Sequence, residues 1–343
     1  MSLTTRAEAL AAFNARAAGA SDAAVTVVAR LGGGAVQENW AVDVEIADGP
    51  MAGRHETVLR SDAISGIAES WPRAQEFALI SAAYEIGMTV PQPLWLDAAG
   101  SVIGRPFYIM RRVRGTAQGR RVLRNLEPEA GEVLANRLGQ ELAKLHGILP
   151  GDRRDSLAFL PEAGLDLIAQ RAAHYRRCLD ALPEPHPALE YAINRMEDLA
   201  PPITQLALCH RDFRTGNYMV DGNTLTAILD FEFSGWSDPY EDLGWFCARC
   251  WRFGATDNEA GGIGSRDAFY AGYAQGSGKP VDDARVRYWE AIAPIRWAII
   301  ALQQGERHAS GQEPSLDLAL TALRAIECEY DLLSDLPKMK KGA

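Results

Sequence analysis

The feature that most constrains this chain is a polar octapeptide enclosed by apolar segments. Residues 210–217 read HRDFRTGN, with LALC before them and YMV after them, and the apolar run TAILD then ends in Asp230. Short apolar runs of this kind are typical of buried strands, while glycine, asparagine and aspartate between them favour turns. The segment therefore predicts short strands and a hairpin that brings Asp212, Asn217 and Asp230 to one end.

The polar side chains of this segment suit magnesium-dependent group transfer. Asn217 and Asp230 offer oxygen ligands of the kind magnesium prefers, and magnesium also uses water and substrate phosphates as ligands. Asp212 is left as a carboxylate that can accept the proton of an attacking hydroxyl. Turn formation alone would explain Asp212 and Asn217. Glu232, two residues after Asp230, adds a second acidic group and favours the chemical interpretation.

The part of the chain before residue 114 predicts a small β-rich lobe. Its residues alternate between polar and apolar or are β-branched, which indicates an antiparallel meander followed by one helix and two more strands. These elements are expected at 24–31, 38–46 and 56–62 for the meander, 69–87 for the helix, and 91–96 and about 101–113 for the last strands.

The remainder predicts a mainly helical lobe, so the fold class is α+β. Apolar residues recur at helical spacing in the segments 129–147, 164–180, 187–199, 265–275, 282–305 and 314–333. The predicted divisions are an N-terminal helix at 1–22, a small β-rich lobe at 23–113, a linker at 114–119, a helical lobe at 120–336, and a basic tail at 337–343.

HRDFRTGN and AILDFEFSGWSDPYEDLGW resemble the catalytic and metal-binding segments of the aminoglycoside phosphotransferase and choline kinase-like family. The resemblance covers roughly residues 24–310 and is most specific at 208–246. It implies a protein-kinase-like bilobal fold, with a small nucleotide-binding lobe at 23–113 and a helical lobe at 120–336 that carries the catalytic loop and the acceptor site. It also implies that Asp212 is the catalytic base and that Asn217 and Asp230 hold the Mg²⁺ ions that bridge the nucleotide phosphates.

Other residues of the two motifs have supporting roles by the same resemblance. His210 matches the histidine that braces the catalytic loop, and Arg211 fills a position where the family often has glycine. Asp238 and Asp242 also match the family pattern. Asp242 lies near the start of an expected helix, where it could cap that helix and hold the catalytic loop in place.

The small lobe contains the further groups that a kinase-like protein needs. Gly32, Gly33 and Gly34 lie between the first two expected strands, where backbone can approach phosphate. Arg60 on the third strand is the cation expected to bind phosphates, although protein kinases have lysine there. Glu76 on the next helix is its expected carboxylate partner. The alternatives are that Arg60 is an exposed strand residue and that Glu76 faces solvent without a partner.

The family resemblance also implies how the nucleotide binds and which kind of acceptor is used. Backbone groups from Arg111 to Val113 are expected to meet the purine edge, with ATP as the donor and GTP as the alternative. The motif wording is similar to phosphotransferase domains fused with acyl-CoA dehydrogenases, which implies a hydroxyacyl or other small hydroxylated acceptor. An aminoglycoside acceptor is second, because the acidic residues after position 260 are dispersed.

Composition narrows the range of partners. The net charge of -10 disfavours nucleic acid. The absence of an apolar run near 18 residues or of a signal-peptide core predicts a cytoplasmic protein without a membrane partner. Two alternatives to a kinase stay open: a non-catalytic kinase-like nucleotide-binding module, and a metal-dependent hydrolase using His210, Asp212 and Asp230. The acceptor's identity and the oligomeric state stay open as well.

Overall fold

The computed structural model describes residues 3–32, 37–62, 70–152, 154–162 and 164–340. The chain forms two compact units. Unit 1 comprises Met1–Asn125, Arg153–Phe159 and Gly216–Ser234, and unit 2 comprises Leu126–Asp152, Leu160–Thr215 and Gly235–Ala343. Unit 1 holds a five-stranded antiparallel sheet and unit 2 is mainly helical, which confirms the predicted α+β class.

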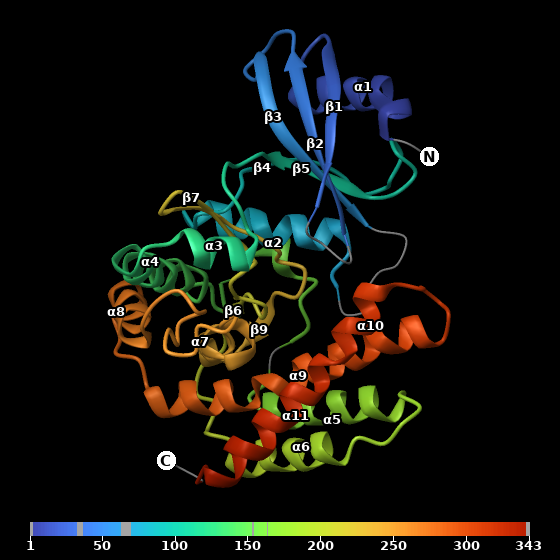
Figure 1. The fold of residues 1–343 in the computed structure, drawn as a ribbon. Coiled ribbons are helices and arrows are strands. Elements are labelled where there is room, and N and C mark those ends of the chain that lie inside the picture. The colour runs from blue at the N-terminus through green and yellow to red at the C-terminus, as the bar shows by residue number, and fades with distance from the viewer. Residues whose placement is uncertain (1–2, 33–36, 63–69, 153, 163, 341–343) are drawn as a thin grey trace. The chain divides into compact units, whose positions relative to one another are not determined.

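The sheet of unit 1 contains the predicted meander (Figure 1). Its strands are β1 (Ala23–Leu31), β2 (Gln37–Ile46), β3 (Gly53–Asp62), β4 (Pro93–Asp97) and β5 (Phe107–Arg111). They lie in the order β1-β2-β3-β5-β4, so β3 occupies the centre of the sheet. The last strand is shorter than the predicted 101–113, because residues 98–104 form a turn with Gly100 and Gly104 at positive φ.

The two faces of this sheet are covered by different helices. The helices of unit 1 are α1 (Ala7–Ala18), α2 (Arg73–Glu85) and α3 (Gly119–Asn125). Successive residues of a strand point to opposite faces. Leu59 of β3 packs with Phe13 of α1 in the apolar core, and Arg60 on the opposite face contacts Glu76 of α2. Strand alternation therefore places the predicted cation against the predicted helix.

A second hairpin of unit 1 follows the octapeptide. It consists of β7 (Tyr218–Asp221) and β8 (Thr224–Ile228), which confirms the strands predicted there. Just outside the paired residues Tyr218 and Ile228, the backbone N–H of Leu229 donates to the carbonyl of Asn217 at 2.8 Å. The hairpin thereby holds Asn217 next to the segment that leads to Asp230.

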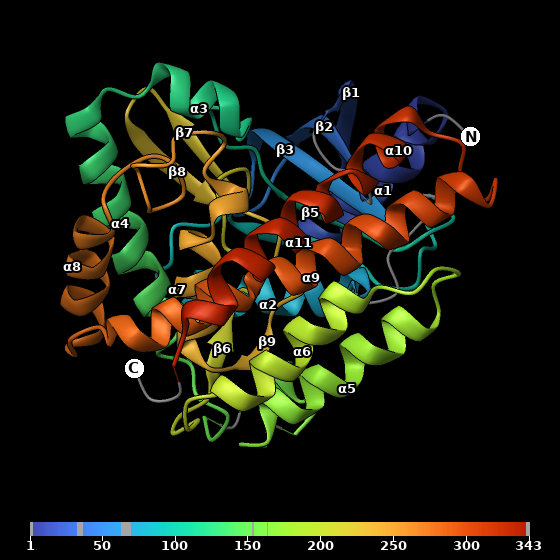
Figure 2. The ribbon, with the colours of Figure 1, turned by 60° about the horizontal axis from the view of Figure 1, so that its bottom comes forward.

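The core of unit 2 lies among its long helices (Figure 2). The elements of unit 2 are α4 (Pro128–Leu145), α5 (Leu167–Asp180), α6 (Pro187–Leu199), β6 (Ala207–Cys209), β9 (Gly235–Ser237), α7 (Pro239–Cys247), α8 (Arg266–Ser277), α9 (Asp283–Ala309), α10 (Leu316–Ala322) and α11 (Arg324–Asp335). The single helix predicted at 314–333 is wrong, since the chain bends at Leu323. α10 and α11 both contact α9, and the bend lets each of them do so.

Close helix packing in unit 2 depends on glycine. α4 and α8 approach so closely that a Cβ on Gly272 would lie 1.8 Å from the carbonyl oxygen of Asn136. A Cβ on Gly139 would lie 2.3 Å from the carbonyl oxygen of Phe269. The absence of side chains at these glycines therefore lets the backbones of α4 and α8 approach this closely. Across the described ranges, no helix combines the length and the apolar composition that crossing a membrane requires.

Candidate active site

Arg60 is the centre of a charged cluster in unit 1. Its Nη2 lies 3.0 Å from Glu76 Oε1 and 2.5 Å from Asp230 Oδ1, and its Nε donates to Glu76 Oε2 at 3.1 Å. Arg60 and Glu76 are both buried. Burial by itself disfavours the guanidinium charge, but the neighbouring carboxylate of Asp230 raises the pKa of Arg60 above its ordinary value. Of the alternatives left open by the sequence, an exposed Arg60 and an unpaired Glu76 are therefore excluded.

A second cation in this cluster was not found by sequence reasoning. Arg73 is fully buried at the start of α2 and forms an ion pair with Glu76. Its Nε lies 2.8 Å from Asp62 Oδ1, and its Nη2 lies 3.9 Å from Glu232 Oε2. Burial, and then the nearby charge of Arg60, lower the pKa of Arg73. The available signal was the spacing of three residues between Arg73 and Glu76, which places them on one helix face.

Glu232 is fixed by several donors. Its Oε2 accepts hydrogen bonds from Gln37 Nε2 at 2.7 Å and Ser70 Oγ at 2.6 Å, and its carbonyl accepts one from the N–H of Trp71 at 2.9 Å. Burial raises the pKa of Glu232, and the nearby negative charge of Asp230 raises it further. The carboxylates of this cluster therefore repel one another.

The charges of the cluster do not balance. Among the described residues, two guanidiniums contact four carboxylates: Glu76, Asp230, Glu232 and Asp62. Glu76 and Glu232 are buried, whereas Asp62 and Asp230 are partly exposed, so water screens part of their repulsion. A divalent cation would neutralise the remaining excess. The donor set also fits magnesium, because Asp230 and the neighbouring Asn217 present oxygen ligands.

Asp230 has an unusual backbone conformation. Its φ is 72°, in the left-handed region that residues other than glycine rarely adopt. Such conformations cost about 1–3 kcal/mol and persist where surrounding structure enforces them. Here the preceding hairpin and the ion pair with Arg60 hold the residue. The carboxylate is thus turned toward Arg60 at the expense of local strain.

The predicted phosphate turn and hinge are only partly described. Gly32 directly follows β1, whereas Gly33 and Gly34 lie outside the described residues. At the predicted hinge, the N–H of Arg111 donates to the carbonyl of Gln92 at 2.9 Å, and the N–H of Arg112 donates to the carbonyl of Glu56 at 3.0 Å. These two donors are therefore already engaged within the sheet.

The predicted catalytic base lies in unit 2, on the loop after β6. Asp212 is buried, and its Oδ1 accepts a hydrogen bond from Trp245 Nε1 at 3.0 Å. Arg214 Nε donates to Asp212 Oδ1 at 3.1 Å and to Oδ2 at 3.3 Å. Neither Arg214 nor Trp245 was assigned to Asp212 from the sequence. The available signal for Arg214 was its place two residues after Asp212, on the same loop.

Asp242 ties this loop to α7. Its carboxylate accepts hydrogen bonds from the backbone N–H groups of His210 and Arg211, both at 2.7 Å, and Nε2 of His146 lies 3.1 Å away. Although burial opposes the charge, the hydrogen bond and charge of His146, the charge of His210 and the backbone N–H of Arg211 lower the pKa of Asp242. The predicted capping role is wrong, because Asp238 caps α7 by accepting from the N–H of Tyr240. The predicted tie to the catalytic loop is confirmed.

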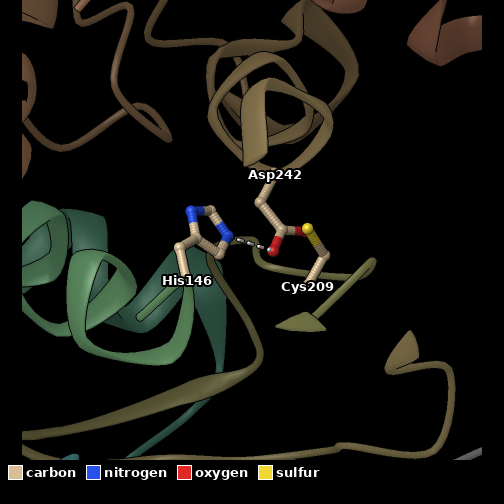
Figure 3. A group of neighbouring side chains, drawn as sticks. All are labelled: His146, Cys209 and Asp242. Carbon is tan, nitrogen blue, oxygen red and sulfur yellow. Dashed lines mark hydrogen bonds and ion pairs between the residues drawn. The ribbon is translucent and has the colours of Figure 1, made fainter. Parts of the chain in front are cut away.

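Asp242 also belongs to a buried group with His146 and Cys209 (Figure 3). Their potential ligand atoms lie within 4.8 Å of one another, as in a metal centre. However, the carboxylate of Asp242 already accepts two backbone hydrogen bonds, and burial raises the pKa of the Cys209 thiol well above its ordinary value. A protonated thiol and a saturated carboxylate are poor ligands. The group is therefore a hydrogen-bonded support for the loop.

The backbone conformation of Arg211 is one that glycine adopts more easily. Its φ is 63°, again in the left-handed region, where a side chain adds strain. Its N–H donates to Asp242, and its carbonyl accepts a hydrogen bond from Arg296. Burial, together with the nearby charge of Arg171, lowers the pKa of Arg211 to about 10. The neighbouring carboxylate of Glu241 opposes that shift.

Comparison with known proteins places the chain in one family. A model of the phosphotransferase enzyme family matches residues 27–289. Acyl-CoA dehydrogenase family member 10 of Mus musculus is 28% identical over 176 residues, which are 50% of this chain and 16% of that protein. Acyl-CoA dehydrogenase family member 11 of Gallus gallus is 30% identical over 177 residues, 49% of this chain and 22% of that protein. The chain thus spans less than a quarter of these two relatives.

Solved structures support the fold. A Ralstonia eutropha protein named as an aminoglycoside phosphotransferase superposes with a TM-score of 0.75 at 20% identity, covering 97% of this chain and 99% of the other. A GDP complex of aminoglycoside 2'-phosphotransferase-IIIa gives a TM-score of 0.59 at 17% identity, covering 90% of this chain and 94% of that one. The kinase-like fold implied by the sequence resemblance is therefore confirmed.

Proposed function

Because the chain belongs to the phosphotransferase enzyme family, we propose that it transfers the γ-phosphoryl group of a nucleoside triphosphate to a hydroxyl group of a small molecule. The donor is ATP, with GTP as the alternative, and the reaction depends on magnesium. Nucleotides bound to structural relatives, such as GDP in the aminoglycoside phosphotransferase complex, support a nucleotide donor. The acceptor is a hydroxyl compound, so the transfer forms a phosphate ester.

The observation that carries this proposal is the position of Arg60. It lies between Glu76 of α2 and Asp230 after the β7–β8 hairpin, within ion-pair distance of both. A phosphate-binding cation in this arrangement is oriented by one carboxylate and adjacent to another that suits a metal ion. A merely structural ion pair would not require a second, strained carboxylate on the same guanidinium.

Asn217 and Asp230 would hold the magnesium, which neutralises charge on the nucleotide phosphates when bound. Arg60 binds phosphate oxygens, and Glu76 and Arg73 keep it in place. Asp212 accepts the proton of the acceptor hydroxyl while the oxygen of that hydroxyl forms a bond to the γ-phosphorus. The bond between that phosphorus and the β–γ bridging oxygen breaks, and the nucleoside diphosphate leaves with the electron pair.

The predicted hinge would bind the purine through main-chain atoms. Because the N–H groups of Arg111 and Arg112 donate to main-chain carbonyls, the main chain of Val113 is the first candidate for contact with the base. The turn expected from the sequence at Gly32, Gly33 and Gly34, of which the last two lie outside the described residues, would supply backbone N–H groups to the phosphates.

A hydroxyacyl compound or another small hydroxylated metabolite is the first candidate acceptor. Its support is the match to acyl-CoA dehydrogenase family members, whose names associate them with acyl thioesters. An aminoglycoside is the second candidate, supported by the name of the Ralstonia eutropha structure.

The test is a transfer assay with γ-labelled ATP and GTP against a panel of hydroxy acids, hydroxyacyl thioesters, amino alcohols and aminoglycosides. We expect label transfer to at least one acceptor class in magnesium and none after chelation. Tight nucleotide binding without transfer to any acceptor and without slow nucleotide hydrolysis would instead indicate the non-catalytic nucleotide-binding module.

A further inference from the structure

The buried indole of Trp245 contacts the proposed catalytic base. Its Nε1 donates to Asp212 Oδ1 at 3.0 Å, and the residue is only 4% exposed. Arg214 also donates to this carboxylate, but its side chain is 26% exposed, so water competes for that contact. The indole is therefore the better shielded of these two partners of Asp212.

Trp245 lies on the helix that also binds the backbone of the loop. Asp242 of α7 accepts hydrogen bonds from the backbone N–H groups of His210 and Arg211. Trp245 follows Asp242 by three residues, which places the two side chains on one face of α7. One helix face thus binds the backbone of the loop through a carboxylate, and the side chain of Asp212 through an indole N–H.

The position of this indole is restricted by its surroundings in unit 2. A Cβ on Gly244 would lie 2.5 Å from the backbone nitrogen of Glu290, so α7 and α9 are in backbone contact there. The guanidinium Cζ of Arg296 lies 5.0 Å from the ring centre of Trp245, and the ring of Trp251 lies 5.3 Å from it. A donor on a closely packed helix keeps its geometry better than one on a loop.

The adjacent Trp251 is a natural comparison for Trp245. Both residues are buried, and both belong to the same small apolar cluster. No group in the described part of the chain accepts a hydrogen bond from Nε1 of Trp251. An indole can therefore pack in this cluster without an acceptor for its N–H, so packing alone does not require the hydrogen bond from Trp245 to Asp212.

Resting on the proposed function, we infer that Trp245 is a positioning residue for proton transfer. Its N–H keeps the carboxylate of Asp212 in the orientation in which it accepts the proton of the acceptor hydroxyl. That proton goes to Asp212, and the indole keeps its own proton throughout. Loss of the indole N–H leaves the base present but less well oriented, so transfer slows while nucleotide binding is unchanged.

The first experiment is kinetic and follows transfer from γ-labelled ATP to an acceptor that takes up label in the panel above. Trp245→Phe keeps an aromatic ring but removes the N–H, so kcat should fall at least about tenfold, with little change in KM for ATP. Trp251→Phe, which removes an N–H that has no acceptor among the described residues, is the matched control and should leave kcat nearly unchanged. In an Asp212→Asn background, Trp245→Phe should cause almost no further loss, because the indole acts through that carboxylate.

The second experiment requires neither an acceptor nor turnover. The chain has eight tryptophans, and ¹⁵N-labelled tryptophan gives one indole N–H signal for each of them in NMR spectra. Asp212→Asn replaces a charged acceptor by a neutral amide, so the signal of Trp245 should move upfield while that of Trp251 stays in place. If Trp245→Phe does not fold, the movement of a single indole signal in Asp212→Asn decides whether the contact exists.

A normal kcat in Trp245→Phe, equal losses in the two phenylalanine variants, a further loss in the double variant or unmoved indole signals would each overturn the inference. A wild-type chain that transfers label to no acceptor would instead contradict the proposed function. The two failures are distinguishable, because the first requires a wild-type chain that is active and the second does not.

Discussion

Two carboxylates that the proposed reaction needs have different surroundings. In unit 1, Asp230 pairs with Arg60 in a group in which two described guanidiniums contact four carboxylates. In unit 2, Asp212 pairs with Arg214 and accepts a hydrogen bond from Trp245. The first arrangement suits a divalent cation, and the second holds the proposed base in one orientation for proton transfer.

The two carboxylates also differ in how they are held. The unit 1 cluster is fixed by side chains of β3, α2 and the segment after β8, which come from distant parts of the sequence. The loop of Asp212 is fixed through its backbone, by the carboxylate of Asp242. Side-chain changes in unit 1 should therefore alter ligand affinity, whereas loss of Asp242 should alter the loop itself.

The largest effect is expected from Asp212→Asn. It keeps the shape of the side chain but removes the proton acceptor, so the transfer rate should fall by about 10²–10⁴-fold. Nucleotide affinity, measured by titration, should stay within about twofold. Asp267→Asn, at an exposed acid on α8, is the control. Near-normal turnover in Asp212→Asn would rule out the assigned base.

The next effect should follow Asp230→Asn, which reduces the negative excess in unit 1. We expect the magnesium concentration needed for half-maximal activity to rise on the order of a hundredfold, since a charged ligand is lost. Asp221→Asn, on the same hairpin and exposed, should leave it unchanged. An unaltered magnesium requirement would exclude Asp230 as a metal ligand.

Asp242→Asn should lower the free energy of unfolding by about 2–3 kcal/mol, because an amide cannot replace all three hydrogen bonds of the carboxylate. Chemical denaturation measures this, with Asp257→Asn in an exposed loop as the control. The pKa of Asp242 is lowered by folding, so its contribution is present above about pH 4 and is lost as pH falls through the folded value. The difference from wild type should therefore shrink in acid, and a constant difference would contradict the charge-based role.

The smallest effect is expected from Arg60→Lys. Lysine keeps the charge but cannot span Glu76 and Asp230 with separate N–H groups, so KM for the nucleotide should rise about tenfold with a smaller change in kcat. Arg54→Lys, an exposed arginine on β3, is the control. An unchanged KM would show that Arg60 acts as a point charge only.

Much of the fold could be predicted because it depends on local patterns. Alternation marked β1–β3, and helical spacing marked α4, α5, α6, α8 and α9 to within a few residues. The bend at Leu323 was missed because no glycine or proline marks it, and contact with α9 decides it. The cap of α7 was also assigned to the wrong acid. Both Asp238 and Asp242 fit the sequence pattern, and the structure shows that Asp238 is the cap.

The sequence by itself determined which groups we propose for the chemistry, since the spacing within HRDFRTGN and the acid at the end of the following hairpin are local properties of the chain. Only the tertiary structure decided their surroundings. Arg73 next to Glu76 and Glu232, and Trp245 next to Asp212, depend on buried contacts between distant segments. Burial and neighbouring charge set the electrostatics of a side chain, and neither is encoded within a few residues of it.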